Sequence, residues 1–190
     1  MTDIPEDPAD DEALFDAEAY EVPGEPPRPI TELAAMHREG TDLMRAKFGP
    51  GLNPDATIFR VRDVDDLTAR PDRIHEMTVR VKAKGGKTEA EEWTRIRAGA
   101  VDTLAYAWLD RAQHRLSAYV LADAHALLED ITTRPGCLIL DPAKRRTHHA
   151  PGGAEFYVVD IRRVRPETIQ ISTVPWASDT SPIAVQDGML

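Results

Sequence analysis

The acidic residues of this chain are concentrated at its N-terminus, and this limits where a folded core can form. Residues 1–29 contain ten acidic residues and a single base, Arg28, and they end in the proline-rich stretch EVPGEPPRP. Such a segment buries too little apolar surface to offset the entropy lost on folding. We therefore interpret residues 1–29 as a disordered acidic tail and expect the fold to begin near residue 30.

The rest of the chain is almost neutral. It holds 23 acidic and 22 basic residues, although the whole sequence carries a formal charge of -10. Hydrophobic residues make up 42% of the sequence, which is typical of a globular protein. We expect a single domain over residues 30–174, followed by a polar C-terminal tail over residues 175–190.

Simple counts exclude several classes of protein. The only cysteine is Cys137, so neither an internal disulfide framework nor a cysteine-based zinc site can form. We expect this thiol to pack in an apolar strand rather than to react. No run of 18 apolar residues is present, which excludes a helical membrane span, and the N-terminus lacks the pattern of a secretory signal. The expected location is therefore the cytoplasm.

The first half of the predicted domain begins with a helix and continues with two strands. The stretch ITELAAMHREGTDLMRAKFGPG has apolar residues at helical spacing, Thr31 as a plausible N-cap and Gly49-Pro50-Gly51 as its end. Gly40 weakens this helical pattern. The stretches DATIFRVRDVDDL and RIHEMTVRVKAKGG alternate apolar and polar residues, as strands do. They predict an antiparallel hairpin with a loop between its strands.

Two further stretches favour helices. TEAEEWTRIRAGAVDTLAYAWLDRAQ places Thr88 and Glu91 at capping-box spacing and has an apolar stripe from Trp93 to Trp108. RLSAYVLADAHALLEDITTRPG is rich in alanine and leucine, which favours a helix throughout. The alternative is a buried strand, RLSAYVLA, followed by a shorter helix capped by Asp123. The stretches RPGCLILDP and EFYVVDIRRVRPETIQISTV then predict strands.

These patterns predict an α+β fold with two antiparallel β segments flanking a central helical pair. In this arrangement the helices pack on one face of the sheet through the stripe from Trp93 to Trp108. The other face of the sheet is then basic and exposed to solvent.

Basic residues from separate segments form the main candidate site. Several cations on one surface are what a polyanion needs, because each neutralised phosphate releases counterions. Arg162, Arg163 and Arg165 add a further basic group near the end of the domain. The polyanion-binding candidates are Arg60, Arg62, Arg80, Lys82, Lys84, Lys87, Lys144, Arg145 and Arg146.

A metal-dependent nuclease is the alternative enzymatic interpretation. Two-metal phosphodiester chemistry needs carboxylates that converge on one site, usually together with a lysine. The weak catalytic candidates are Asp63, Asp65, Lys82 and Asp160. Arg80 stands two residues before Lys82, where a nuclease of the restriction type carries an acid. We therefore expect at most a degenerate or atypical nuclease.

Other chemistries receive little support. His148 and His149 are adjacent and lack the spacing of a metal site, so no metal is expected. The stretch KGGKT, residues 84–88, resembles the end of a phosphate loop but lacks its first glycine. It predicts at most a weak anion site at the start of the following helix. No nucleotide-binding or serine-nucleophile motif is present, and no cofactor is expected.

The sequence therefore favours a non-enzymatic accessory protein that binds nucleic acid or another polyanion, with the acidic tail modulating this contact. The alternative from a different class is a protein-interaction module, such as an immunity, antitoxin or phage assembly factor, that uses the tail as its binding element. The abundance of Ala, Arg and Asp is typical of a high-GC bacterium or its phage.

Overall fold

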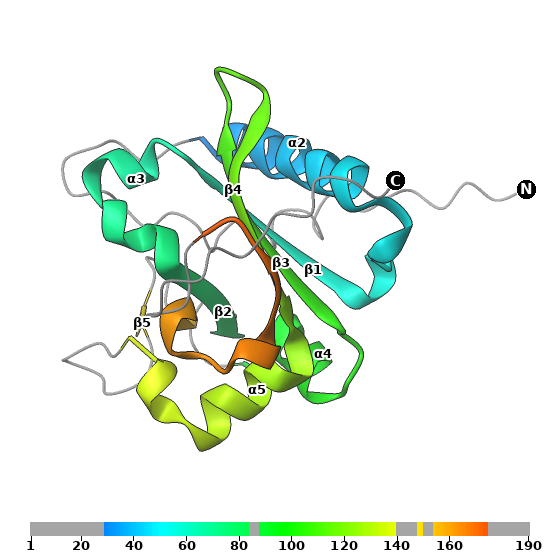
Figure 1. The fold of residues 1–190 in the computed structure, drawn as a ribbon, viewed down its shortest axis with the longest axis vertical. Coiled ribbons are helices and arrows are strands. Elements are labelled where there is room, and N and C mark those ends of the chain that lie inside the picture. Colours follow the sequence, from blue (N-terminus) through cyan, green and yellow to red (C-terminus); the bar gives the residue numbers. More distant parts are fainter. Residues whose placement is uncertain (1–28, 84–87, 140–147, 150–153, 175–190) are drawn as a thin grey trace, which may run out of the picture.

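A computed structural model describes residues 29–83, 88–139, 148–149 and 154–174. The helices are α2 (Ile30–Phe48), α3 (Asp66–Ala69), α4 (Glu91–Arg97) and α5 (Ala124–Thr133). The strands are β1 (Thr57–Asp63), β2 (Glu76–Lys82), β3 (Thr103–Asp110), β4 (Arg115–Asp123), β5 (His148–His149), β6 (Glu155–Asp160) and β7 (Ile169–Ser172). Helices and sheets occur together, which confirms the predicted α+β class (Figure 1). Both predicted tails, apart from Pro29, lie outside the described residues.

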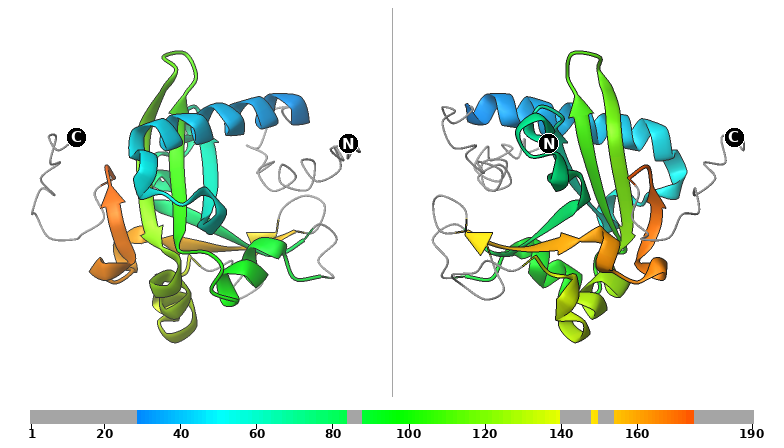
Figure 2. Two further views of the ribbon diagram at one scale, coloured as in Figure 1. Left: turned by 90° about the vertical axis from the view of Figure 1, so that its right-hand side faces the viewer. Right: turned by 60° about the vertical axis from the view of Figure 1, so that its left-hand side comes forward.

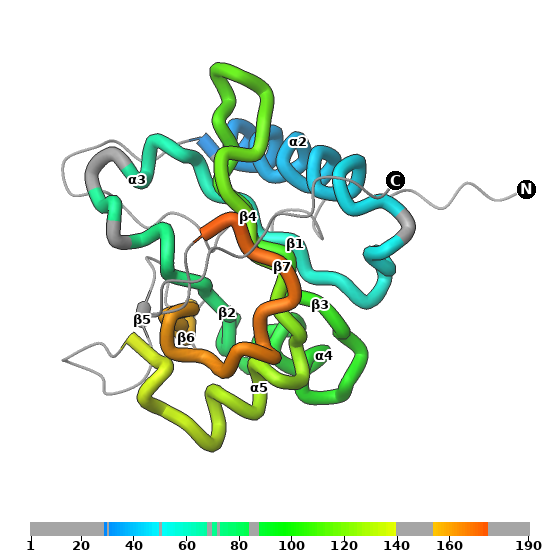
Figure 3. Tube along the Cα trace, viewed as in Figure 1, coloured from blue at the N-terminus to red at the C-terminus, as the bar shows by residue number. Residues whose placement is uncertain are grey.

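The strands form two sheets. Sheet A has the order β1-β3-β4-β7, in which β1 is parallel to β3 and the other pairs are antiparallel. Sheet B has the order β2-β6-β5 and is antiparallel throughout. Figures 1 and 3 show β7 beside β4, and both views in Figure 2 show β6 running across the direction of β3 and β4. Among the described helices, none is long and apolar enough to span a membrane.

Strand β3 lies at the centre of the fold and is buried on both faces. Ala105, Ala107 and Leu109 pack in the cluster that includes the apolar residues of α2. Tyr106 and Trp108 point to the other face, into a cluster formed with sheet B, α4 and α5. Sheet A is therefore the middle layer between α2 on one side and sheet B with two helices on the other (Figure 2).

Helix α2 lies unusually close to sheet A at Gly40. A Cβ atom placed on Gly40 would be 2.4 Å from Cγ1 of Val61, which is too close for any side chain. The glycine that weakens the helical pattern in the sequence is thus the residue that allows the helix to contact β1. The helix begins at Ile30 with Pro29 as its N-cap, so the predicted N-cap, Thr31, lies in the first turn. The predicted end at Gly49 is confirmed.

The predicted hairpin of the first two strands is wrong. β1 pairs with β3 in sheet A, from Thr57 opposite Thr103 to Asp63 opposite Leu109. β2 pairs instead with β6, with Glu76 opposite Asp160. The alternation within β2 is confirmed, because its apolar side chains Met77, Val79 and Val81 are buried and the intervening ones are not. Local alternation predicts a strand, but the choice of partner depends on which distant strand completes the core.

The predicted long helix over residues 88–113 is also wrong. Helix α4 has Ala90, not Thr88, as its N-cap and ends at Arg97, and Gly99 adopts a positive φ of 71° just before β3 begins. Trp93 therefore lies on a helix and Trp108 on a strand, although both enter the same core. A strand buried on both faces has no polar alternation, so its apolar residues also fit a helical stripe. The two central helices, α4 and α5, are consequently shorter than predicted and are separated along the chain by β3 and β4.

The alternative interpretation of residues 115–136 is confirmed. β4 ends at Asp123, whose side chain accepts a hydrogen bond of 2.8 Å from the backbone N–H of Ala126 and caps α5. The strand predicted near Cys137 is reduced to a single bridge between Leu138 and Val159. The last predicted strand is divided into β6 and β7 by the 3-10 turns η5 (Ile161–Arg163) and η6 (Pro166–Thr168).

Substitution of Gly40 by alanine should separate helix propensity from packing. Alanine favours a helix by about 1 kcal/mol over glycine, yet the clash with Val61 should make Gly40→Ala destabilising by about 1–3 kcal/mol. Urea unfolding measures this change. Gly51→Ala is the control, since its added Cβ would meet no atom within 4 Å. In a Val61→Ala background the cost of Gly40→Ala should become smaller, because the contacts with Cγ1 and Cγ2 are removed and only that with Cβ, at 3.1 Å, remains. An equal cost in both backgrounds would contradict the packing argument.

Candidate anion-binding site

The basic residues predicted on β1 are not on a solvated surface. The side chain of Arg60 is only 5% exposed and forms an ion pair with Glu92 of α4. Arg62 donates a hydrogen bond from Nε to the hydroxyl group of Tyr106 and lies over its ring. Both arginines point to the face of sheet A that packs against sheet B. The predicted basic and solvated sheet face is therefore wrong for β1, because a second sheet covers it.

The basic residues of β2 face away from the core, but each has a local contact. The guanidinium group of Arg80 lies 5.9 Å from the ring centroid of Phe156, and its backbone N–H is 3.4 Å from Oε1 of Glu92. Nζ of Lys82 forms an ion pair of 3.1 Å with Glu155. Arg60 and Arg80 thus meet at Glu92, which links α4 to both sheets. The remaining predicted cations, Lys84, Lys87, Lys144, Arg145 and Arg146, lie outside the described residues.

The predicted nuclease candidates are spread over different parts of the fold. Asp63 is at the end of β1, where Oδ1 accepts a hydrogen bond from the backbone N–H of Asp65. In sheet B, Lys82 and Asp160 lie at opposite ends of the β2–β6 pair, because Lys82 is opposite Glu155 and Asp160 is opposite Glu76. Within the described ranges, no group of three or more His, Cys, Asp or Glu side chains is arranged to hold a metal ion.

The structure also tests the predictions for two other features, the KGGKT stretch and Cys137. Helix α4 begins three residues after Thr88, so the predicted anion site at the end of KGGKT has no helix start there. Cys137 is buried, as predicted, and burial together with the charge of Asp130 raises the pKa of its thiol. A raised pKa keeps the thiol protonated and unreactive at neutral pH.

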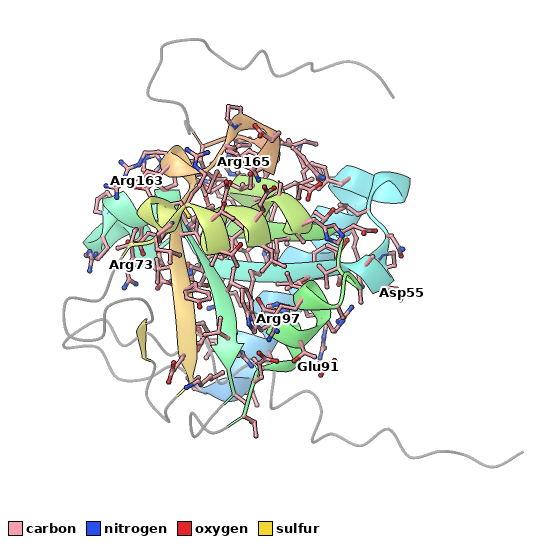
Figure 4. All side chains as sticks on the ribbon, turned by 90° about the horizontal axis from the view of Figure 1, so that it is seen from below. Asp55, Arg73, Glu91, Arg97, Arg163 and Arg165 are labelled. Carbon is pink, nitrogen blue, oxygen red and sulfur yellow. The ribbon has the colours of Figure 1, made fainter. Side chains whose placement is uncertain are left out.

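A group of arginines gathers where β6 and α5 end, and we call it the outer arginine cluster. It consists of Arg134, Arg162, Arg163 and Arg165. Arg134 directly precedes η4 (Pro135–Cys137), and the other three arginines follow β6. η4 and η5 are in contact, and Nη1 of Arg163 is 3.5 Å from the carbonyl oxygen of Gly136, so these two segments of the chain adjoin. Figure 4 shows Arg163 and Arg165 at the upper edge of the molecule in that view, away from Arg97.

Asp160 anchors the first half of this cluster. Its carboxylate is 2% exposed and accepts two parallel hydrogen bonds of 2.8 Å from Nε and Nη2 of Arg162. Nε of Arg163 lies 3.3 Å from the second oxygen of this carboxylate, Oδ2. Burial would raise the pKa of Asp160, but the hydrogen bonds and charges of both arginines outweigh it and hold the pKa below its ordinary value. The carboxylate is therefore ionised at neutral pH.

Asp130 anchors the second half. This fully buried carboxylate accepts hydrogen bonds from the backbone N–H and Nε of Arg165, at 3.0 and 2.7 Å, and from the hydroxyl group of Thr168 at 2.6 Å. Nη1 of Arg134 is 3.9 Å away. A hydrogen bond from Arg165 to Glu129, with the nearby Asp130, raises the pKa of the Arg165 guanidinium. Asp130 thus joins α5 to the turn before β7.

The cluster combines ordered attachment with exposed charge. The side chains of Arg134, Arg162 and Arg163 are 52%, 46% and 60% exposed, while the carboxylates beside them are buried. An anchored guanidinium loses little side-chain entropy on contact with an anion, and its planar fork matches phosphate oxygens. The sequence indicated Arg162, Arg163 and Arg165 as basic but not their anchors. The one available signal was the Asp-x-Arg spacing, because Asp160 also accepts from the backbone N–H of Arg162.

His75 lies beside this cluster. It closes the 3-10 turn η3 (Pro71–His75) and directly precedes Glu76, the residue paired with Asp160. Its Nδ1 atom is buried and has no hydrogen-bond partner among the residues that the structure describes. Burial lowers the pKa of His75 below its ordinary value, Arg162 lowers it further, and Asp160 partly offsets these effects.

The buried Arg60–Glu92 pair should show strong coupling between its two members. Removing one partner, as in Arg60→Met or Glu92→Leu, should cost about 3–5 kcal/mol because the remaining charge is buried. The double substitution should recover most of this loss. A double-mutant cycle from urea unfolding measures the coupling energy. The exposed pair Glu89–Arg97 provides the control, for which at most about 1 kcal/mol is expected.

The lowered pKa of His75 predicts a pH-dependent stability. Because the folded state disfavours the protonated form, its contribution is fully present above the ordinary pKa of about 6.5 and is lost as pH falls through the folded value. The free energy of unfolding should therefore decrease on acidification over this range. His75→Gln should remove that part of the pH dependence, whereas the exposed His125→Gln should retain it. An unchanged profile in His75→Gln would contradict the assignment.

Three exposed guanidinium groups beside two buried carboxylates form the strongest candidate site in the described part of the chain. Its chemistry is that of anion binding, since arginine has five donors and no acceptor. Comparison with known protein families, curated protein sequences and solved structures finds no match to this chain.

Proposed function

We propose that this protein is a cytoplasmic, non-enzymatic accessory factor that binds a phosphate-rich polyanion, with nucleic acid as its ligand. The observation that carries the proposal is the outer arginine cluster, whose exposed guanidinium groups are oriented by the buried carboxylates of Asp130 and Asp160. This cluster replaces the β1 residues as the centre of the binding surface. The acidic residues 1–29 compete with the ligand for the same cations.

The local charge balance supports an anionic ligand. Arg162 and Arg163 share the single carboxylate of Asp160, so this half of the cluster carries more positive than negative charge. Arg165 is surrounded by Glu129, Asp130 and Glu167, and it serves mainly to hold the cluster together. Arg134 extends the positive surface at the end of α5, where the helix dipole also favours a cation.

The residue types favour contacts with phosphates over contacts with bases. Single-stranded binding usually relies on exposed aromatic side chains that stack on bases. In the ranges that the structure describes, the aromatic side chains are buried or half-buried, and the one large apolar side chain exposed is Ile171. We therefore expect binding that depends on backbone charge, varies little with base sequence and weakens steeply with salt.

Fluorescence anisotropy with labelled duplex DNA, duplex RNA and single strands tests this function. Affinity of the full chain should fall steeply between about 50 and 200 mM salt. The double variant Arg162→Gln/Arg163→Gln should bind more weakly, and the slope of log K against log salt should decrease by about 2. Arg97→Gln/Arg115→Gln removes the same charge from two exposed, ion-paired arginines elsewhere and should bind as wild type.

Two further variants test the other parts of the proposal. Deletion of residues 1–29 should tighten binding, because a competing segment with ten acidic residues is removed. Replacing Lys144, Arg145 and Arg146 together by glutamine should weaken binding if the sequence-based candidates contribute. Failure of both the full chain and the tail deletion to bind any of these nucleic acids would overturn the proposed function.

A further inference from the structure

His75 lies beside the outer arginine cluster. β2 begins at Glu76 and pairs with the end of β6, so His75 lies next to the point where the chain turns into Arg162 and Arg163. One ring nitrogen, Nδ1, is buried, and no described residue forms a hydrogen bond with it.

Charged residues lie on each segment around this imidazole. Across the strand pair are Asp160 and Arg162, which act on it with opposite sign. On its own segment are Arg73 and Glu76, whose side chains are 3.8 Å apart. Helix α3, which packs on η3, contributes Asp66. With Asp160 already shared by two arginines, a protonated His75 would add a third cation around one buried carboxylate.

We infer that anion binding at the outer arginine cluster is coupled to protonation of His75, so that ligand binding takes up a proton and is favoured at acidic pH. This inference rests on the proposed function. In the free protein, repulsion by Arg162 opposes protonation of His75. A phosphate bound at Arg162 and Arg163 supplies the negative charge that offsets this repulsion. By thermodynamic linkage, a ligand that favours the protonated form must bind more tightly when His75 is protonated.

The wild-type protein provides the first test. The Cε1–H resonance of His75 is followed by NMR against pH, with and without a saturating short DNA duplex. The titration midpoint of His75 should move to higher pH in the complex. A midpoint of His75 that the duplex leaves unchanged would overturn the inference.

Binding measurements with a neutral variant provide the second test. Wild-type affinity for the duplex should be about fivefold or more tighter near about pH 5.5 than near about pH 7.5. His75→Gln cannot take up the proton and should lose this difference, whereas His125→Gln should keep it. Retention of the full pH effect in His75→Gln would assign it to other groups and overturn the inference.

These outcomes are separable from failure of the proposed function. If no nucleic acid binds at either pH, the function itself is wrong. If the duplex binds with the predicted salt dependence but without proton uptake, the function stands and only the role of His75 is rejected. Calorimetry in two buffers of different ionisation enthalpy measures the proton uptake directly.

Discussion

The burial of β3 on both faces is the constraint on which the rest of the structure depends. Its small side chains, Ala105 and Ala107, face α2 and leave space for a close helix, while Tyr106 and Trp108 fill the wider space towards sheet B. This asymmetry explains the position of Gly40 against Val61, since a helix packed over alanines comes near the neighbouring strand. The two sides of sheet A are therefore packed differently, because β3 presents different side chains to each.

Buried carboxylates connect these layers. Glu92 joins α4 to β1 through Arg60 and contacts the backbone of β2, while Asp130 and Asp160 hold the turns that follow β6. A buried charge is tolerated only when it is paired and hydrogen-bonded, so each carboxylate positions the arginines around it. The outer arginine cluster follows from this requirement: the same contacts that stabilise the chain turns also orient its exposed guanidinium groups. The arginines of this cluster can therefore stabilise the fold and bind a ligand at the same time.

Features that depend on neighbouring residues were predictable from the sequence. They include the alternation of β2, the end of α2 at Gly49, the burial of Cys137 and, as the alternative interpretation, the Asp123 cap of α5. The failures involve partners far apart in the chain. β3 resembled a helix because both of its faces are apolar, and Arg60 resembled a surface residue because its partner, Glu92, lies 32 positions away. Asp130 gave no signal as an anchor for the same reason, because its partner Arg165 lies 35 positions away.

The sequence by itself determined the acidic N-terminal segment, the mixed α+β class and the local character of β2, α2 and α5, because composition and short-range periodicity act through residues that are close along the chain. Only the tertiary structure decided that β1 pairs with β3 and β2 with β6, that Arg60 is buried, and that Arg134 joins Arg162 and Arg163. Strand partners and buried ion pairs are selected by the complete core, since their free energy depends on which distant apolar faces and charges are removed from water together.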